Sequence, residues 1–219
     1  MFSWLNIEID VSISSAAYIE WINLVFFYSV HVVIWVADTE NTSLVHSRKL
    51  PSWLIAELRS DHAGEMGAVY IYKGILRVTR DTRVRQFATQ HLNTEVKHLE
   101  LMETLIGLED QSIFIPLWRL AGFFTGAIPA LFGANAIYAT IHSVETFVDK
   151  HYQQQIDRLL NDAEHIHLAE AIEACRQDEV QHRDEAMCFL IRSPGPLLRA
   201  WCWLVGFGSS NAVAVARWR

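Results

Sequence analysis

Cysteine is scarce in this sequence, and its cysteines lie far apart. Cys175, Cys188 and Cys202 are the three that occur among 219 residues, and none belongs to a CxxC pair. A thiolate zinc site or a dithiol redox site needs closely spaced cysteines, so both kinds of site are excluded by this pattern. We expect three reduced, buried thiols.

The sequence also lacks any run of basic residues. Its formal net charge is −7, so a nucleic-acid partner would find no positive surface to bind. No glycine fingerprint of a dinucleotide site and no useful strand-period alternation of apolar residues occur. Because the length favours one core, we expect an all-α protein with a single active site.

Apolar residues are abundant, at 51% of the chain, which makes contact with a membrane a serious expectation. An apolar stretch over residues 22–37 has no basic residues before it and so does not resemble a signal peptide. It is shorter than the ~20 residues of a spanning helix. An interfacial helix, a marginal span and a helix buried against the body all fit, so the role of residues 1–50 stays open.

Residues 51–219 form the predicted helical domain. Two antiparallel helix pairs are expected, over residues 53–106 with a break at 79–82 and over residues 138–191 with a break at 161–162. Between the pairs, residues 113–137 are nearly uncharged but rich in proline and glycine, which predicts a broken hydrophobic hairpin dipping into one leaflet. Residues 197–219 predict a further apolar, tryptophan-bearing helix.

Two Glu-x-x-His pairs lie in these helices and indicate a metal site. Each pair places a carboxylate and an imidazole on one helix face. The pairs are Glu95 with His98 and Glu179 with His182. A third pair, Glu164 with His167, shows that the motif alone also arises by chance.

Position relative to the turns distinguishes the pairs, because a helix hairpin brings residues equidistant from its turn to one height. Glu65 and Glu95 are centred on the first turn, and Glu145 and Glu179 on the second. Glu164 finds no counterpart, and we interpret it as part of a solvated helix start. The sequence therefore predicts a four-helix bundle with four carboxylate and two histidine ligands, which are Glu65, Glu95, His98, Glu145, Glu179 and His182.

The charge of this set fits two divalent cations, which neutralise four buried carboxylates. Mixed carboxylate and imidazole ligation suits iron or manganese and disfavours a structural zinc. Asp178, next to Glu179, is placed to orient a bound imidazole. His151 and Tyr152, six and seven residues after Glu145, are candidates for substrate contact or proton transfer, and an ordinary helix surface is the alternative for both.

Several segments resemble the demethoxyubiquinone hydroxylase family of ubiquinone biosynthesis. The resemblance covers about residues 53–192, in order and with family-like spacing. It rests on the runs LRSDHAGE at 58–65, GA at 67–68, IY at 71–72, PLW at 116–118, VE at 144–145, HY at 151–152 and DEVQH at 178–182.

The resemblance implies a ferritin-like bundle at a membrane face, with the six predicted ligands holding two iron ions. It further implies that dioxygen hydroxylates the ring of a polyprenyl methoxy-benzoquinone, with NADH as electron donor. Expected partners are the lipid bilayer, the quinone, and a homo-oligomer or lipid-presenting protein. The expected location is peripheral, on a bacterial or mitochondrial inner membrane. A ferritin-like ferroxidase or iron-storage protein shares the ligand pattern and is the alternative.

Overall fold

The computed structural model describes residues 50–218, and within this part of the chain every regular element is helical. The predicted all-α class is therefore confirmed, while the apolar stretch 22–37 lies outside the described residues. The elements are α3 (Ser52–Val78), α4 (Thr82–Leu105), the short 3₁₀ turn η1 (Leu108–Asp110), α5 (Ile115–Ala130), α6 (Ala134–Leu159), α7 (His167–Cys188) and α8 (Pro196–Ala216).

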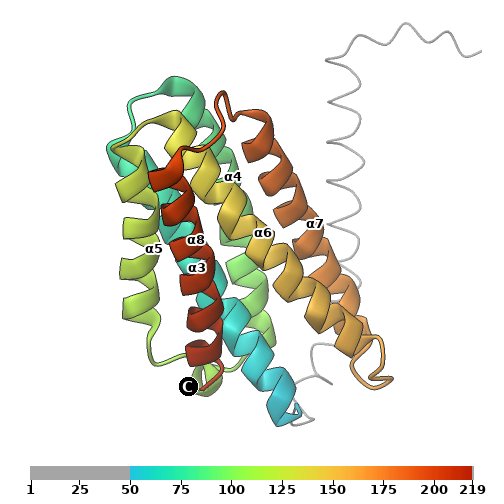
Figure 1. Cartoon of the computed structure of the whole chain (residues 1–219). Helices are drawn as coiled ribbons and strands as arrows, with labels where there is room; N and C mark the ends of the chain where they lie inside the picture. Colours follow the sequence, from blue (N-terminus) through green and yellow to red (C-terminus); the bar gives the residue numbers. More distant parts are fainter. Residues whose placement is uncertain (1–49, 219) are drawn as a thin grey trace, which may run out of the picture. The chain divides into compact units, whose positions relative to one another are not determined.

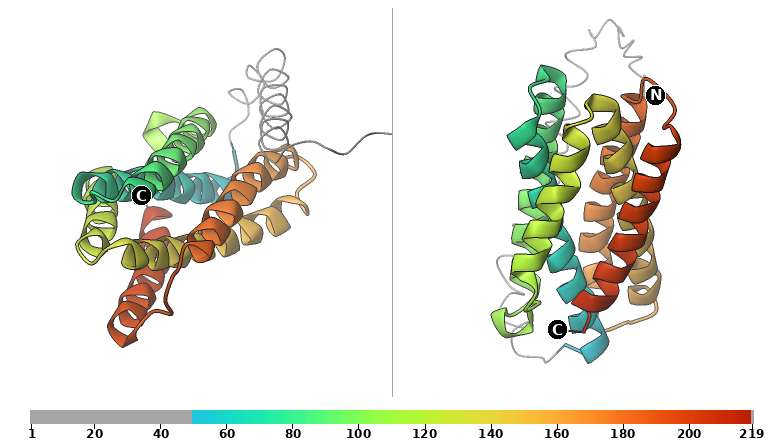
Figure 2. Two further views of the ribbon diagram at one scale, coloured as in Figure 1. Left: turned by 90° about the horizontal axis from the view of Figure 1, so that it is seen from above. Right: turned by 60° about the vertical axis from the view of Figure 1, so that its left-hand side comes forward.

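Four of these helices form the bundle that carries the candidate site. α3 packs against α4 and α6 against α7 as two hairpins, and α4 and α7 join them. α5 lies along α3, and α8 packs against both α3 and α6 (Figure 1). In both views of Figure 2, α8 in red lies on the outside of the bundle.

The helix ends follow local chemistry in the sequence. The side chain of Asp81 accepts hydrogen bonds from the backbone N–H groups of Arg83 and Val84 at 2.8 and 3.1 Å, which satisfies donors that no carbonyl reaches at a helix start. α4 therefore starts immediately after the predicted break. α7 starts later and ends earlier than predicted, because residues 161–166 form a turn and the chain leaves the helix after Cys188.

The break predicted within the hydrophobic segment 113–137 is misplaced, because residues 115–130 form one continuous helix, α5. Its glycines do not break the helix but let its backbone approach α3. A Cβ at Gly122 would overlap the carbonyl oxygen of Gly67, and one at Gly126 that of Ile71. The turn comes only at Gly133, whose φ of 94° few other residues adopt. Backbone contact between the two helices thus replaces the expected break.

The cysteines are free in this structure, as expected, but the expected burial holds for only one of them. Cys175 is buried, Cys202 half-buried and Cys188 exposed at the end of α7. Among the helices of residues 50–218, none combines the length and hydrophobicity needed to cross a membrane.

Candidate metal centre

The six predicted ligands meet in the interior of the bundle. α3 contributes Glu65, α4 contributes Glu95 and His98, and α6 contributes Glu145. Glu179 and His182 come from α7. All six are buried, with exposed fractions between 1% and 5%.

The ligands form two overlapping groups rather than two separate sites. Glu65 and His98 belong to one group, Glu145 and His182 to the other, and Glu95 and Glu179 to both. Within each group the candidate ligand atoms all lie within 4.8 Å of one another. Two metal ions held by these groups would have Glu95 and Glu179 as common ligands.

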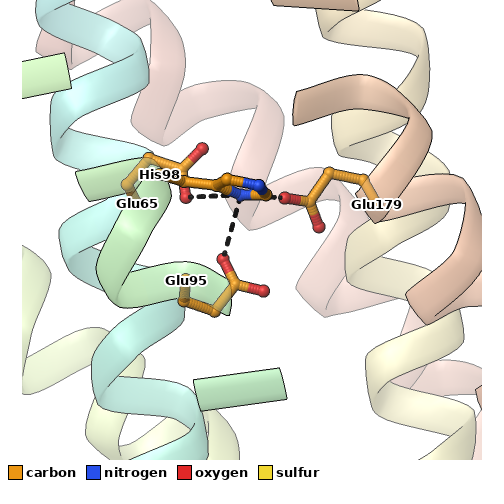
Figure 3. A group of neighbouring side chains, drawn as sticks. All are labelled: Glu65, Glu95, His98 and Glu179. Carbon is orange, nitrogen blue, oxygen red and sulfur yellow. Dashed lines mark ion pairs between the residues drawn. The ribbon is translucent and has the colours of Figure 1, made fainter. Parts of the chain in front are cut away.

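The shared glutamates each direct one oxygen toward each histidine. Oε1 of Glu179 lies 2.9 Å from Nδ1 of His98, and its Oε2 lies 3.3 Å from Nδ1 of His182. The oxygens of Glu95 lie 3.1 Å from Nδ1 of His182 and 4.0 Å from Nδ1 of His98. Figure 3 shows the first group, with carboxylates from three helices turned toward the ring of His98. Both imidazoles thus present the same nitrogen to the centre of the site.

The buried polar atoms at the centre fit bound cations. Nδ1 of His98, Nδ1 of His182, Oε1 of Glu95 and both oxygens of Glu179 make no hydrogen bond, although they lie close together. Buried polar atoms are rarely left without partners in proteins. Four carboxylates and two imidazoles would balance two divalent ions, and the donor set suits iron or manganese. The residues present therefore fit a two-metal centre.

Protonation of the site without metal reflects the same excess of carboxylates. Burial, together with the neighbouring carboxylates, raises the pKa of Glu65 and Glu145 well above the usual range. Burial acts in the same direction on Glu179, but the imidazoles of His182 and His98 outweigh it and lower its pKa. Without metal, Glu65 and Glu145 therefore tend to hold protons. Bound cations would neutralise the same two carboxylates instead.

An outer carboxylate orients one of the two imidazoles. Nε2 of His98 lies 3.0 Å from Oδ2 of Asp178, whose side chain is 39% exposed. A hydrogen bond donated from Nε2 holds the ring with Nδ1 facing the centre, where a bound cation would take the place of a proton. Asp178 therefore contacts the outer nitrogen of a candidate metal-binding imidazole, as the sequence predicted.

Tyr152 and a second tyrosine contact the two glutamates that are not shared. The hydroxyl of Tyr152 donates a hydrogen bond to Oε1 of Glu65. Tyr72, which the sequence analysis missed, donates to Oε1 of Glu145 at 3.3 Å. A signal existed, because each tyrosine lies seven residues after the glutamate of its own helix.

His151 is buried and contacts a residue that lies one helical turn from the candidate ligand Glu65. Its Nε2 lies 3.0 Å from Oδ1 of Asp61, which also accepts a hydrogen bond from Gln155 at 2.7 Å. Asp61 precedes Glu65 by one turn of α3. Burial raises the pKa of Asp61, and His151 opposes that effect. His151 thus lies near the site but contacts none of the six ligands directly.

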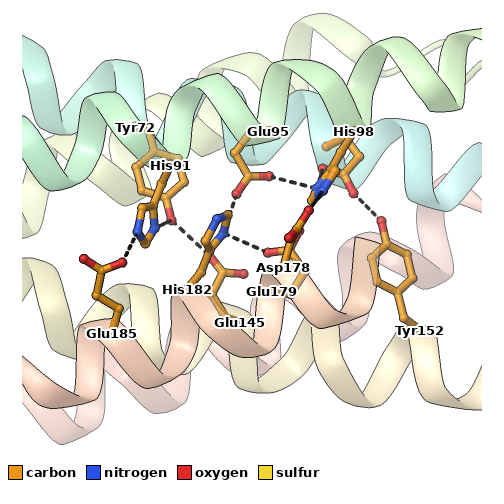
Figure 4. Close-up of polar contacts among 11 residues, drawn as sticks. Tyr72, His91, Glu95, His98, Glu145, Tyr152, Asp178, Glu179, His182 and Glu185 are labelled. Carbon is orange, nitrogen blue, oxygen red and sulfur yellow. Dashed lines mark hydrogen bonds and ion pairs between the residues drawn. The ribbon is translucent and has the colours of Figure 1, made fainter. Parts of the chain in front are cut away.

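His91 is a buried residue of the site that the sequence analysis also missed. Its ring stacks on that of His182 with centroids 4.0 Å apart. Nδ1 lies 3.2 Å from the hydroxyl of Tyr72, and Nε2 lies 2.8 Å from Oε2 of Glu185. Figure 4 shows this row of side chains beside the ligands. His91 lies one turn before Glu95 on the ligand face of α4, and that spacing was the available signal.

The third Glu-x-x-His pair lies apart from this centre. Glu164 falls in the turn after α6, and His167 is the first residue of α7. Neither residue belongs to a metal-binding group of the described part of the chain. The turn-symmetry argument therefore selected the two pairs that meet.

Comparison with known proteins identifies the family of this chain. The family described as "Ubiquinone biosynthesis protein COQ7" matches residues 52–216. The chain belongs to this family. Members similar to it include an "NADPH-dependent 3-demethoxyubiquinone 3-hydroxylase, mitochondrial" of Dictyostelium discoideum, 36% identical over 64% of this chain, and one of Caenorhabditis elegans, 30% identical over 73%. A "3-demethoxyubiquinol 3-hydroxylase" of Rhodospirillum rubrum is 38% identical over 58%.

The matches span 66%, 87% and 60% of the lengths of these three COQ7-family proteins, respectively. The predicted family resemblance is thus confirmed. The family match extends from the first helix of the bundle to α8, so it includes every candidate ligand and both outer helices, α5 and α8.

Proposed function

We propose that this COQ7-family protein hydroxylates the ring of a polyprenyl methoxy-benzoquinone of the demethoxyubiquinone type. The observation that carries the proposal is the pair of overlapping ligand groups that share Glu95 and Glu179. Such a centre would hold two metal ions, as the two-metal sites of helical bundles do. The names of the three relatives supply the substrate class.

The metal ions are proposed to be iron, held by the six residues of the two groups. Bound iron would supply the reduction and cleavage of dioxygen, which protein side chains cannot perform. The overall reaction takes up two electrons and two protons, places one oxygen atom on the ring and releases the other as water. The protein's part is to position the ions, keep bulk water out of the buried centre and bring protons to it.

Electrons are proposed to come from a reduced nicotinamide. The family resemblance implied NADH, whereas the Dictyostelium and Caenorhabditis relatives carry NADPH in their names. A comparison of the two donors in one assay distinguishes them.

His151 and Tyr152 are proposed to act on the substrate side of the centre. Tyr152 hydrogen-bonds the ligand Glu65, and His151 bonds Asp61 on the same helix. This places a phenol and an imidazole next to each other on α6, where they can hold the oxygen substituents of a quinone ring or transfer a proton.

Attachment to a membrane surface is proposed through α5 and α8. Both helices leave large apolar side chains exposed, and α5 carries a single charged residue, Arg119. An isoprenoid chain prefers hydrocarbon, so a surface-bound enzyme receives its substrate from lipid. The exposed apolar residues are Leu117, Leu120, Phe124 and Ile128 on α5, and Leu197, Trp203, Leu204, Phe207 and Val215 on α8.

The partners expected from the sequence, a second copy of the chain or a lipid-presenting protein, are proposed to dock on the same apolar surface. The proposed location is the face of a bacterial or mitochondrial inner membrane, in keeping with the word "mitochondrial" in two of the relatives' names. Binding to vesicles in the absence of other proteins tests the lipid contact separately.

Isotopically labelled dioxygen tests the reaction. The iron-loaded protein, given reductant and a demethoxyubiquinone analogue, is expected to place one labelled atom in a new ring hydroxyl, detected by mass spectrometry. The matched control is Glu179→Ala, which removes a shared ligand and should yield no product. Consumption of ferrous iron and dioxygen without any labelled quinone would instead support the ferroxidase alternative.

A further inference from the structure

Two positive side chains from different helices converge on one aromatic ring. Nζ of Lys73, on α3, lies 4.6 Å from the centre of the Tyr70 ring, and the guanidinium carbon of Arg119, on α5, lies 5.8 Å from the same centre. Lys73 and Arg119 are exposed, and Tyr70 is half-buried. The ring attracts each cation, but the two cations repel each other. An anion that contacts both cations would offset this repulsion.

Neither cation has an anionic partner in the described part of the protein. Among residues 50–218, Lys73 and Arg119 form no ion pair. Arg119 uses one nitrogen, Nε, which lies 3.3 Å from the sulfur of Met66, and the two terminal nitrogens of its guanidinium stay available. A guanidinium group binds a phosphate through two parallel hydrogen bonds. Arg77, one turn after Lys73, is a further exposed cation.

The helices around these cations carry no acidic residue, although the chain as a whole has a net charge of −7. α3 has none after Glu65, and α5 and α8 have none at all. The charged residues of α5 and α8 are Arg119 and Arg199. A negatively charged surface would therefore be attracted to this side of the bundle, whereas the rest of the chain is acidic overall.

The depth of the cations matches the headgroup layer of a bilayer. α5 exposes Leu120 and Phe124, while its Gly122 and Gly126 pack against α3 (Figure 1). Packed helices have axes roughly 8–10 Å apart, and an interfacial helix sinks about 5–10 Å into the boundary between headgroups and acyl chains. With the apolar side of α5 in lipid, side chains at the level of α3, such as Lys73, lie at about the depth of the phosphates.

We propose that Lys73 and Arg119 bind the phosphate of an anionic phospholipid, with Tyr70 as the ring that positions both cations. The inference rests on the proposed attachment of α5 to a membrane, and it names the lipid class that this contact selects. A zwitterionic headgroup carries its own cation beside the phosphate, so two protein cations favour a headgroup of net negative charge. The bound headgroup fixes where α5 meets lipid and so orients the bundle on the membrane.

A lipid surface suits these residues better than an acidic protein does. Exposed apolar side chains begin directly after Arg119, at Leu120, and continue along α5 with Phe124 and Ile128. Basic residues at the edge of an apolar helix face are typical of helices that lie in the membrane interface. A long basic side chain can also keep its stem on apolar surface while its charge reaches the phosphates.

Flotation of the full-length protein with two kinds of vesicle tests the proposal. One kind is phosphatidylcholine alone, and in the other phosphatidylglycerol replaces a third of it. The wild type should bind the anionic vesicles more tightly. Lys73→Gln and Arg119→Gln should each lower that binding about fivefold, since a basic residue near an anionic surface contributes about 1 kcal/mol. Both variants should bind the neutral vesicles as the wild type does.

Lys150→Gln is the matched control, because it removes an exposed lysine from α6. Its binding to both kinds of vesicle should equal that of the wild type. A loss as large as that of Lys73→Gln would show that net charge alone governs binding and would overturn the site. High salt should reduce the preference for anionic vesicles, because it screens the charges.

Substitution of the ring separates a built site from general attraction between charges. Tyr70→Leu keeps both cations and removes the ring, so binding to anionic vesicles should fall about two- to fivefold, the equivalent of one exposed cation–π contact. Tyr70→Phe keeps the ring and should bind as the wild type does. Wild-type binding by Tyr70→Leu would overturn the role of the ring in the site.

The two proposals fail in different ways. Equal flotation of the wild type with neutral and anionic vesicles would leave membrane attachment standing and refute the headgroup site. The site would also be refuted if the double variant Lys73→Gln with Arg119→Gln bound anionic vesicles like the wild type, and an acidic protein would then be the better partner. Flotation with neither kind of vesicle would refute attachment. Calorimetric titration with a short-chain, soluble phosphatidylglycerol would then decide the headgroup site separately, through wild-type binding that the double variant lacks.

Discussion

Tyr72 and Tyr152 occupy equivalent places in the two halves of the bundle, and each hydrogen-bonds the glutamate of the other's helix. Tyr72 donates to Glu145 at 3.3 Å, and Tyr152 donates to Glu65. Each lies seven residues, about two helical turns, after its own helix's glutamate. This exchange is possible because α3 and α6 run antiparallel across the site. The tyrosines therefore fix the ligands that are not shared.

Removal of one of these hydroxyls should weaken metal binding. Tyr152→Phe leaves Glu65 without its donor, and loss of such an outer partner typically costs about tenfold or more in metal affinity. Competition with a chelator measures the affinity. Tyr70→Phe, on α3 and outside the site, is the control of the same chemical change and should bind normally. Equal affinity in Tyr152→Phe and wild type would contradict this role.

The shared and unshared glutamates should differ in how many ions depend on them. Glu95→Ala or Glu179→Ala removes a ligand from both groups, so we expect loss of both ions. Glu65→Ala removes a ligand from one group, so we expect about one ion to remain. Metal analysis of the purified variants gives the count.

Glu164→Ala is the control for this count, because Glu164 lies outside both ligand groups. Its metal content should equal that of the wild type. Two ions retained in Glu95→Ala, or ions lost in Glu164→Ala, would show that the ligand assignment is wrong.

Close contact of α5 with α3 should make glycine essential at position 126. Gly126→Ala places a methyl group against the carbonyl oxygen of Ile71, and overpacking of this kind costs roughly 1–3 kcal/mol in free energy of unfolding. Gly64→Ala, exposed on α3 with open space around it, should instead be neutral or stabilising by up to ~1 kcal/mol. Chemical denaturation of both variants checks the contrast.

The metal-free protein should lose stability as pH rises. Burial raises the pKa of Glu65 and Glu145 above the ordinary 4.5, so the folded state binds more protons than the unfolded chain above that pH. The free energy of unfolding then falls with increasing pH until the raised values are passed. Bound metal displaces these protons and reverses the trend. Melting curves at several pH values, with and without metal, test this, and a metal-free protein that gains stability toward pH 8 would contradict it.

Vesicle binding should depend on the apolar face of α5. Leu120→Glu with Phe124→Glu introduces two charges among exposed apolar side chains and should release the protein from liposomes in a flotation assay. Leu160→Glu changes an equally exposed leucine beyond the end of α6 and should leave binding intact. Flotation of the double variant at the wild-type level would rule out α5 as the contact.

Much of the metal centre could be predicted from local sequence. Helical periodicity put Glu95 with His98, and Glu179 with His182, on single helix faces, and the turn positions paired them with Glu65 and Glu145. These relations depend only on the regular rise and rotation of a helix. One of the two tyrosines was predicted. Tyr152 was identified seven residues after its glutamate, whereas the same spacing was overlooked at Tyr72.

Other features depended on contacts between helices. Proline and glycine in residues 113–137 predicted a break, but the same glycines allow α5 to pack backbone against backbone on α3. A local rule weighs the poor helix propensity of glycine, roughly 1 kcal/mol per residue, and cannot include the packing that offsets it. Prediction from local propensity therefore errs toward a break in the helix, because it omits the packing of α5 on α3.

The sequence by itself determined which side chains share a helix face and so which ones are candidate ligands, since spacing along a helix fixes the face on which a residue lies. Only the tertiary structure decided that Glu95 and Glu179 serve both groups, and that His91 joins Glu185 to Tyr72. Both outcomes depend on how far each helix is rotated about its own axis and how closely neighbouring axes approach. Those quantities are set by packing across the whole bundle, which no local stretch of sequence contains.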